Sequence, residues 1–223
     1  MKNINKTRII TIDGPAGAGK TTVSRELASR LGCVYVDTGS LYRGVAYEVY
    51  RCNLNWHDDA ELDTLLSSIS FELKLHHGGL YRLFSSGQDI TDYIRTPEIT
   101  MLSSDLSAKA AVRQALLGFQ REIAKISDAI FEGRDMGTVV FPDADYKFFL
   151  SADLNTRALR RYSEMNGSKT LDEIKQAIEL RDNSDSSREI APLKPAEDAI
   201  MVDSTNLNHG EVVDKILSYI NQN

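Results

Sequence analysis

The sequence has few cysteines, no long hydrophobic run and no excess of positive charge. Cys33 and Cys52 form neither a CxxC motif nor a Cys/His cluster, so we expect both to be packing residues rather than metal ligands. No stretch approaches the roughly eighteen consecutive apolar residues that a transmembrane helix needs. Residues 1–8 are not followed by an apolar run with a small-residue cleavage site, so no signal peptide is expected. A cytoplasmic location follows as the expectation.

Positive charge is in the minority, because 26 Lys and Arg stand against 32 Asp and Glu and give a formal net charge of −6. Proteins that bind nucleic acid or membrane surfaces without sequence preference normally present a basic face, so we expect neither partner. The cations are nevertheless uneven, with 15 Arg and 11 Lys, which raises the question of where the guanidinium groups lie. The 223 residues, 42% of them hydrophobic, are enough to bury the core of one large domain.

Short apolar runs rich in β-branched and aromatic residues recur, and each is followed by turn residues and a helical pattern. Runs without alternation are typical of strands buried on both faces, and intervening helices are what parallel strands require. We therefore predict an α/β fold with about five parallel strands flanked by helices. The predicted strands are 8–12, 33–36, 129–131, 146–150 and 199–202, and the predicted helices are 20–31, 40–51, 97–107, 109–126, 155–165, 171–183 and 210–221.

One segment departs from this pattern. Residues 71–75 alternate strictly between apolar and polar, residues 76–79 can turn, and residues 80–84 can return as a partner strand, with 88–91 as a third. We interpret residues 63–95 as an antiparallel insertion on the parallel core. His76 and His77 fall in the turn without a third ligand, so we do not expect a metal there.

The strongest local signal is residues 14–21, GPAGAGKT, which match G-x-x-x-x-G-K-[ST] between a predicted strand and a predicted helix. The glycines let backbone N–H groups converge on phosphate oxygens, and the helix N-terminus adds the positive end of its dipole. Lys20 can reach the β- and γ-phosphates, and Thr21 offers a hydroxyl to Mg²⁺. The motif predicts binding of a nucleoside triphosphate.

The loop alone does not identify the reaction, because GTPases, motors, ATPases and small-molecule kinases share it. A GTPase would be expected to carry an Asn-Lys-x-Asp motif, whereas Asn55, Asn155 and Asn183 are not followed by Lys. A kinase needs a second anion-binding site facing the loop, and arginine suits it because a planar guanidinium matches phosphate oxygens.

Polar residues follow two further predicted strands. Asp37 ends the second strand, where it can serve Mg²⁺ or its water shell, and Ser40 either caps the next helix or meets a ligand, with Arg43 in the first turn. After the third strand, two glycines flank Arg134 and Asp135. This pair indicates a ligand loop, with a plain surface ion pair as the alternative.

Three arginines, Arg157, Arg160 and Arg161, have the spacing i, i+3 and i+4 and share one helical face. Like charges there repel one another unless an anion neutralises them, although a solvated face would also explain the run.

A second set, Arg181, Asp185 and Arg188, again shares one face, and an internal salt-bridge ladder would explain it without a ligand. Both sets follow predicted strand ends, where α/β proteins bind ligands.

Taken together and in this order, the segments GPAGAGKTT, DTGSLYR, EGRDMGT and RDNSDSSR resemble bacterial cytidylate kinases from about residue 8 to residue 220. The similarity continues through residues 191–199 and 203–205. The resemblance implies one P-loop kinase domain over 1–223, with an antiparallel NMP-binding insertion at about 57–105 and a short LID at about 157–170. It also implies a monomer that transfers the γ-phosphoryl group of ATP to CMP or dCMP with Mg²⁺.

The same resemblance implies roles for individual residues. The ATP-binding residues would be Gly14, Pro15, Ala16, Gly17, Ala18, Gly19, Lys20, Thr21, Thr22, Arg157, Arg160 and Arg161, and the metal residues Thr21 and Asp37. For CMP, Ser104, Arg113 and Asp135 would read the base, Ser40, Arg43, Arg134 and Arg188 would hold the phosphate, and Arg181 and Asp185 the sugar. The residues that act in the transfer itself would be Lys20, Arg134, Arg157, Arg161 and Arg188.

Two alternatives remain at the level of the sequence. One is a kinase for UMP or another small acceptor, against which Asp135 weighs, because a carboxylate suits the donating amino group of cytosine and not the oxygen of uracil. The other is a nucleotide-dependent switch without phosphoryl transfer.

Overall fold

The computed structural model describes residues 7–75, 81–164 and 169–222. The chain divides into two compact units, the first formed by Met1–Tyr35 with Ile126–Asn223 and the second by Val36–Lys125. Among the residues described, no helix is both long enough and apolar enough to cross a bilayer.

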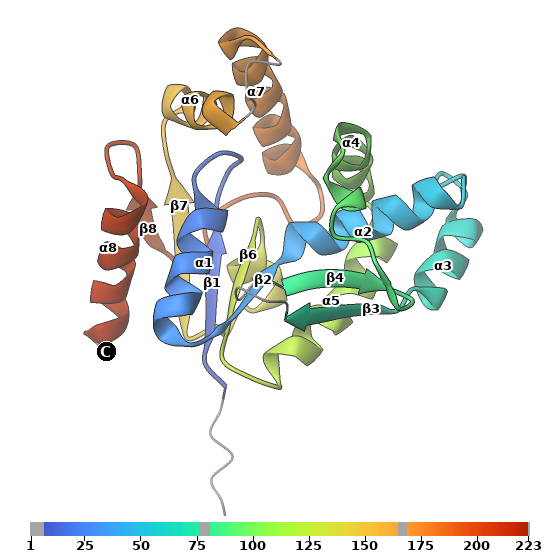
Figure 1. Ribbon diagram of the computed structural model, residues 1–223, viewed down its shortest axis with the longest axis horizontal. Helices are drawn as coiled ribbons and strands as arrows, with labels where there is room; N and C mark the ends of the chain where they lie inside the picture. The colour runs from blue at the N-terminus through green and yellow to red at the C-terminus, as the bar shows by residue number, and fades with distance from the viewer. Residues whose placement is uncertain (1–6, 76–80, 165–168, 223) are drawn as a thin grey trace, which may run out of the picture. The chain divides into compact units, whose positions relative to one another are not determined.

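A five-stranded sheet with the order β2-β6-β1-β7-β8 organises the first unit (Figure 1). Strand β1 pairs in parallel with β6 on one side and β7 on the other, and β7 pairs in parallel with β8. The strands are β1 (Ile9–Asp13), β2 (Val34–Asp37), β6 (Ala129–Gly133), β7 (Tyr146–Ser151) and β8 (Ile200–Asp203). All five predicted strands are confirmed.

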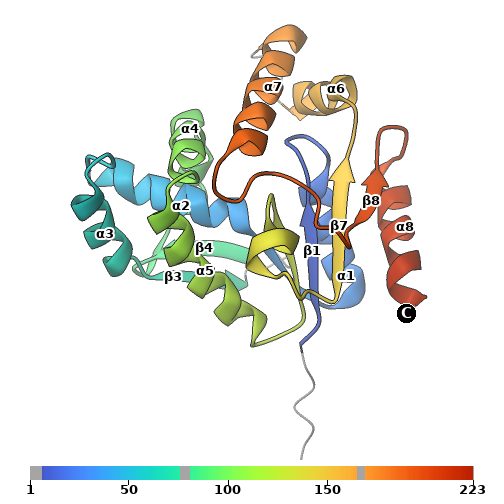
Figure 2. The ribbon, with the colours of Figure 1, turned by 180° about the vertical axis from the view of Figure 1, so that it is seen from behind.

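The central strands β1 and β6 are buried over their whole length, which explains why they read as continuous apolar runs. One face of the sheet packs its Ile10 and Ile12 against Val23 and Leu27 of α1 (Lys20–Leu31) and Ile216 of α8 (His209–Asn221). Helices α6 (Leu154–Glu164) and α7 (Leu171–Ser187) lie beyond the carboxyl ends of the strands in both views (Figures 1 and 2). These ends are where the polar residues of the candidate site gather.

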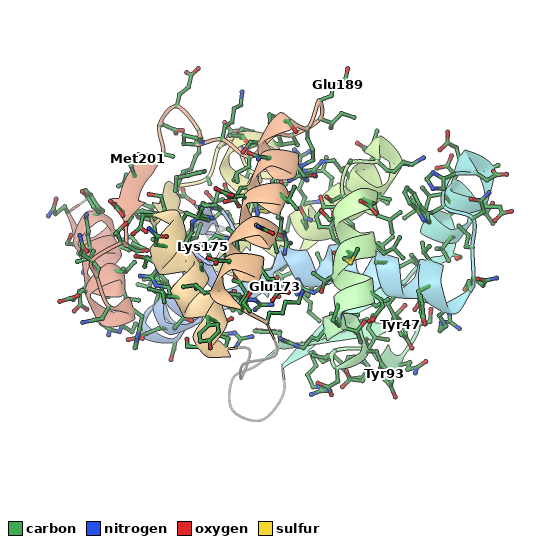
Figure 3. All side chains as sticks on the ribbon, turned by 90° about the horizontal axis from the view of Figure 1, so that it is seen from above. Tyr47, Tyr93, Glu173, Lys175, Glu189 and Met201 are labelled. Atoms are coloured by element: carbon green, nitrogen blue, oxygen red, sulfur yellow. The ribbon has the colours of Figure 1, made fainter. Side chains whose placement is uncertain are left out.

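The second unit joins a small antiparallel sheet to four helices. Strands β3 (Phe71–Leu75), β4 (Tyr81–Ser85) and β5 (Gln88–Asp89) form the sheet, which confirms the antiparallel prediction. The helices are α2 (Thr38–Arg51), α3 (Asp59–Ser68), α4 (Pro97–Leu106) and α5 (Ala110–Ala124), with the short turn η1 (Tyr93–Arg95). Tyr47 of α2 stacks on Tyr93 with ring centroids 5.7 Å apart (Figure 3).

The antiparallel strands begin at Phe71, later than the start of the predicted segment 63–95. Residues 63–68 belong to helix α3 rather than to a strand, because Asp58 caps this helix by accepting from the N–H groups of Ala60 and Glu61 and Leu62 is buried. The predicted third strand 88–91 is reduced to β5, and the predicted helix 171–183 continues to Ser187 in α7. The predicted turn at 76–79 lies outside the described residues.

Candidate nucleotide-binding site

The phosphate loop leaves the central strand β1 and ends at the N-terminus of α1, as the sequence predicts. Gly14 and Gly17 have positive φ angles of 149° and 76°. A Cβ atom at Gly14 would overlap the carbonyl oxygen of Leu150, and one at Gly17 would lie 3.1 Å from both Cβ and the carbonyl oxygen of Arg157. These two positions therefore require glycine for conformation and for space.

Lys20 is buried, and its Nζ donates to the carbonyl oxygen of Pro15 at 2.8 Å, within the loop itself. Burial, together with repulsion from Arg134, lowers the pKa of Lys20 to about 7, although Glu132 opposes the change. The amine therefore carries its charge most readily when an anion lies beside it. Thr22, the other predicted residue at this helix end, is exposed.

Glu132, at the end of β6, is a residue that the sequence analysis did not select. Its Oε1 accepts from the hydroxyl of Thr21 at 2.8 Å, and its Oε2 accepts from the hydroxyl of Tyr35 at 2.6 Å. The signal was available, because Glu132 directly follows the predicted apolar strand 129–131, and ligands of α/β proteins bind at such strand ends. Thr21 and Glu132 place a hydroxyl and a carboxylate together where the phosphate loop meets α1.

The segment after Arg134 and Asp135, part of the predicted ligand loop, is a single π-helical turn, η2 (Met136–Val140). Asp13, another residue that was not selected, accepts from the backbone N–H groups of Met136 at 2.9 Å and Gly137 at 2.8 Å. Burial raises the pKa of Asp13 to about 6, despite these two hydrogen bonds. Asp13 thus fixes η2 onto the end of β1, with Asp135 buried just before the turn.

Arg157 of α6 lies against the phosphate loop. Its Nη1 donates to the carbonyl oxygen of Ala16 at 3.1 Å and also to Oδ2 of Asp182 on α7, while its Nε donates to the carbonyl oxygen of Ala152 at 3.0 Å. The sequence predicts an arginine near the ATP phosphates at this position. The structure adds that the arginine is buried and ion-paired there.

Arg160 and Arg161 differ from each other although they are neighbours. Arg160 donates to the carbonyl oxygen of Ala18 at 3.3 Å and to both the hydroxyl and the carbonyl oxygen of Ser204, at 3.0 and 2.7 Å. Arg161 pairs with Glu164 at 2.9 Å, and its side chain is 55% exposed. Of the three predicted LID arginines, the structure therefore brings Arg157 and Arg160 to the loop and leaves Arg161 towards solvent.

Asp185 of α7 connects two of the arginines predicted to hold the acceptor phosphate. Its Oδ2 accepts from Nε of Arg134 at 2.8 Å, and its Oδ1 accepts from Nη2 of Arg188 at 2.7 Å. Burial works to raise the pKa of the Asp185 carboxyl, but the charges of Arg134 and Arg188 outweigh burial and hold that pKa below its ordinary value. Arg181, the predicted partner of Asp185 at the sugar, is partly buried one turn earlier on α7. The structure thus gives Asp185 an ion-pairing role beside its predicted contact with the sugar.

In the second unit, Asp37 rather than Ser40 is the N-cap of α2, which corrects the prediction. Asp37 accepts from the backbone N–H of Ser40 at 3.1 Å and from Nη2 of Arg43 at 2.8 Å, and the hydroxyl of Ser40 donates to the carbonyl oxygen of Asp37 at 2.6 Å. Because the helix begins at Thr38, Arg43 lies in its second turn rather than its first. Asp37 and Arg43, predicted for the metal and the acceptor phosphate, thus form an ion pair with each other.

The other two predicted residues of the second unit are linked through the connection between α4 and α5. The hydroxyl of Ser107 donates to the carbonyl oxygen of Ser104 at 2.7 Å, and the carbonyl oxygen of Ser107 accepts from Nη1 of Arg113 at 3.1 Å. The Arg113 guanidinium also lies 5.6 Å from the ring centroid of Tyr42, within the range of a cation–π contact. The second unit therefore brings Ser104 and Arg113 together. The predicted third base-reading residue, Asp135, belongs to the first unit.

Comparison with known proteins bears on this arrangement directly. The family model described as "Cytidylate kinase" matches residues 10–222. The chain belongs to the cytidylate kinase family.

Curated relatives in the cytidylate kinase family align over nearly their whole length. A protein named "Cytidylate kinase" from Geobacter sulfurreducens is 45% identical over 217 residues, which cover 96% of this chain and 93% of the relative. Another with that name, from Caldicellulosiruptor bescii, is 44% identical over 224 residues, 97% of this chain and 95% of the relative. The crystal structure of an uncharacterized protein from Eubacterium ventriosum has a TM-score of 0.50 and 14% identity over 98% of this chain and 100% of its own, a likeness of fold alone.

Proposed function

We propose that this chain transfers the γ-phosphoryl group of ATP to CMP and dCMP, forming ADP with CDP or dCDP. One observation carries the proposal: two anion-binding features occur together in the first unit. A phosphate loop follows β1, and the cluster of Arg134, Asp185 and Arg188 lies after the adjacent strand β6. A phosphate loop alone suits any nucleoside triphosphatase, whereas additional guanidinium groups at the same sheet edge suit a phosphorylated acceptor. Membership of the cytidylate kinase family supports CMP as that acceptor.

The proposed reaction needs charge neutralisation and alignment more than proton transfer, because phosphoryl transfer passes through a loose transition state. Lys20, at the end of the phosphate loop, would neutralise charge on the transferring group. Arg134 and Arg188 would align the acceptor phosphate, whose attacking oxygen is already ionised. No general base is therefore assigned.

Magnesium would bind with the nucleotide and neutralise charge shared by its β- and γ-phosphates. The oxygen donors of Thr21 and Glu132 fit a hard cation, since Mg²⁺ prefers carboxylate, hydroxyl and water oxygens. Asp37 is the further predicted ligand, and a metal or its water shell would compete there with Ser40 and Arg43 for the carboxylate.

The three LID arginines are proposed to act on the ATP phosphates in different ways. Arg157 and Arg160 already contact carbonyl groups of the loop, so they need little movement to reach its ligand. Arg161 is held by an exposed ion pair with Glu164, and such pairs are weak enough to exchange for a phosphate.

Base recognition is proposed to rest on Asp135, Ser104 and Arg113. The amino group of cytosine donates a hydrogen bond, which a carboxylate accepts, whereas the corresponding oxygen of uracil would face the carboxylate unfavourably. Asp135 is 2% exposed, so little water would compensate such a mismatch. We therefore expect UMP to be the poorer acceptor. We also expect the enzyme to act as a monomer in the cytoplasm.

The alternative of a switch without phosphoryl transfer explains the phosphate loop but assigns no purpose to the cluster around Asp185. An assay that follows ADP formation separates the two, because a switch would hydrolyse ATP slowly whether or not CMP is present. ADP formation that depends on CMP is the result expected of the kinase.

The decisive experiment is a coupled kinase assay with CMP, dCMP, UMP, AMP and GMP, run on the wild type and on Asp135→Ala. We expect the wild type to use CMP and dCMP with the highest kcat/KM. The Asp135→Ala variant should lose this preference, at a cost on the order of 1–3 kcal/mol in transition-state binding of CMP. A wild type that prefers UMP or AMP would contradict the substrate assignment, and unchanged kinetics of the variant would remove Asp135 from base recognition.

A further inference from the structure

Asp182 of α7 makes contacts that none of the proposed roles explains. Its Oδ1 accepts from the backbone N–H of Ala16 in the phosphate loop at 3.3 Å, and its Oδ2 accepts from Nη1 of Arg157. The same Nη1 donates to the carbonyl oxygen of Ala16 at 3.1 Å. One carboxylate, one guanidinium and one loop residue therefore contact each other in a closed set.

The spacing of residues along α7 explains why Asp182 reaches Arg157 and the phosphate loop. Ile174 and Ile178 of α7 are buried against Ala158 of α6, four residues apart and on one face. Asp182 follows Ile178 by four more residues and therefore lies on the same face, one turn closer to the end of the helix. It meets Arg157, which directly precedes Ala158 on α6. Helices α6 and α7 lie side by side in all three views (Figure 3).

The ion pair is shielded from water and is held close to the loop. The side chain of Arg157 is 10% exposed and that of Asp182 is 19% exposed. At Gly17 a Cβ atom would lie only 3.1 Å from the Arg157 backbone oxygen, so α6 packs directly onto the loop. The backbone of Arg157 is therefore held beside the loop by the packing of α6.

We propose that Asp182 is the resident anion of the phosphate loop, a positioning residue that holds Arg157 and the Ala16 N–H until the terminal phosphate of the donor nucleotide competes for them. Both donors attract an anion, and a carboxylate and a phosphate close to the same donors repel each other. Nucleotide binding then weakens the contacts of Asp182 with Arg157 and the Ala16 N–H. When Asp182 re-forms these contacts after transfer, it favours product release. The inference rests on the proposed function only in taking a nucleoside triphosphate as the ligand.

Asp185 provides a matched comparison on the same helix. It lies three residues after Asp182, is buried, and also pairs with arginines, but its partners are Arg134 and Arg188 rather than the loop. Removal of its charge should therefore affect the acceptor and leave donor binding nearly unchanged.

The test measures the Kd of a non-hydrolysable ATP analogue and of inorganic tripolyphosphate by calorimetry for wild type, Asp182→Asn, Asp182→Glu and Asp185→Asn. We expect Asp182→Asn to bind both ligands about fivefold to tenfold more tightly, because one repulsive charge is gone while an oxygen remains for the Ala16 N–H. Asp182→Glu keeps the charge and should not tighten binding. Asp185→Asn should stay within about twofold of the wild type for both ligands.

If Asp182 only supported the loop and did not compete with phosphate, Asp182→Asn should raise the Kd instead of lowering it, since a loosened loop binds phosphate less well. Unchanged or weaker binding by Asp182→Asn would therefore overturn the proposal. If that variant fails to fold, Asp182→Ser removes the charge and keeps an acceptor, and the same tightening is expected. In the wild type, tripolyphosphate should shift the Ala16 amide resonance in a nitrogen–proton NMR spectrum, and an unmoved resonance would equally contradict the proposal.

These measurements do not depend on the acceptor. If CMP proves not to be phosphorylated, the proposed function fails while the affinities for the ATP analogue and tripolyphosphate still decide the role of Asp182. Conversely, if CMP is phosphorylated but Asp182→Asn binds the ATP analogue with unchanged affinity, the proposed function stands and the proposed role of Asp182 fails.

Discussion

At the scale of single residues, Asp13 fixes the turn η2 onto the end of β1, although burial disfavours its charged form. Its carboxylate is 4% exposed, and burial raises its pKa from 3.8 to about 6 even though two backbone N–H groups donate to it. Between these two pH values the native state binds more protons at this group than the unfolded chain does. The contribution of Asp13 to the free energy of unfolding is therefore fully present below about pH 4 and is lost as the pH rises through 6.

The matching prediction compares the wild type with Asp13→Asn, which cannot titrate. The free energy of unfolding of the wild type, taken relative to this variant, should fall by roughly 2 kcal/mol between pH 4 and pH 7. Urea unfolding at several pH values measures the difference, and the variant removes the contributions of all other titrating groups. A difference independent of pH would mean that the Asp13 carboxyl titrates alike in both states.

At the scale of elements, two helical glycines of the second unit have opposite surroundings. Gly118 on α5 is exposed, and apart from the adjacent residues and backbone of its own helix, no described atom lies within 4 Å of the place where its Cβ would be. Gly44 on α2 faces the small sheet, where a Cβ would lie 2.9 Å from Cζ of Phe71 and 3.0 Å from Cδ2 of Leu83. The same substitution should therefore have opposite signs at the two positions.

We expect Gly118→Ala to raise the free energy of unfolding by about 1 kcal/mol, since alanine has the higher helix propensity and restricts the unfolded chain. Gly44→Ala should lower it by about 1–3 kcal/mol through overpacking against Phe71 and Leu83. Denaturant unfolding of the wild type and of the two variants measures both changes in the free energy of unfolding. A stabilised Gly44→Ala would show that the contact between α2 and the sheet relaxes freely.

The elements that could be predicted from sequence are those that carry their own signal. Strands β1 and β6 are apolar throughout because both their faces are buried, and α1 begins where the loop motif ends. Helix α3 was missed although Asp58 supplies a capping residue, because the strict alternation after it dominated the interpretation. The turn η2 depends on hydrogen bonds to Asp13, which is far away in the sequence, so the local sequence pattern could not predict this turn.

At the scale of the whole molecule, the net charge of −6 conceals how the arginines are paired. Several arginines that the sequence assigned to phosphates are held by carboxylates of the same chain: Arg43 by Asp37, Arg157 by Asp182, and Arg134 and Arg188 by Asp185. The family resemblance assigned these arginines to phosphates, and helical spacing grouped some of them on one face. The short spacing of Asp185 and Arg188 already allowed the pair that they form. The Arg134–Asp185 and Arg157–Asp182 pairs join segments far apart in the sequence, so they could not be predicted. A phosphate that binds these arginines would therefore compete with carboxylates of the same chain.

The division of the assigned residues between the two units leads to a test by hydrogen exchange. A non-hydrolysable ATP analogue should protect amides of the phosphate loop and of α6 in the first unit, because Arg157 and Arg160 of α6 donate there to the carbonyl oxygens of Ala16 and Ala18. CMP alone should protect amides of α4 and α5 in the second unit, where Ser104 and Arg113 are linked through Ser107. UMP at the same concentration serves as the control and should protect these helices less. If CMP leaves the peptides of residues 97–124 unchanged while it is phosphorylated, Ser104 and Arg113 take no part in holding it, and base recognition falls to Asp135 of the first unit.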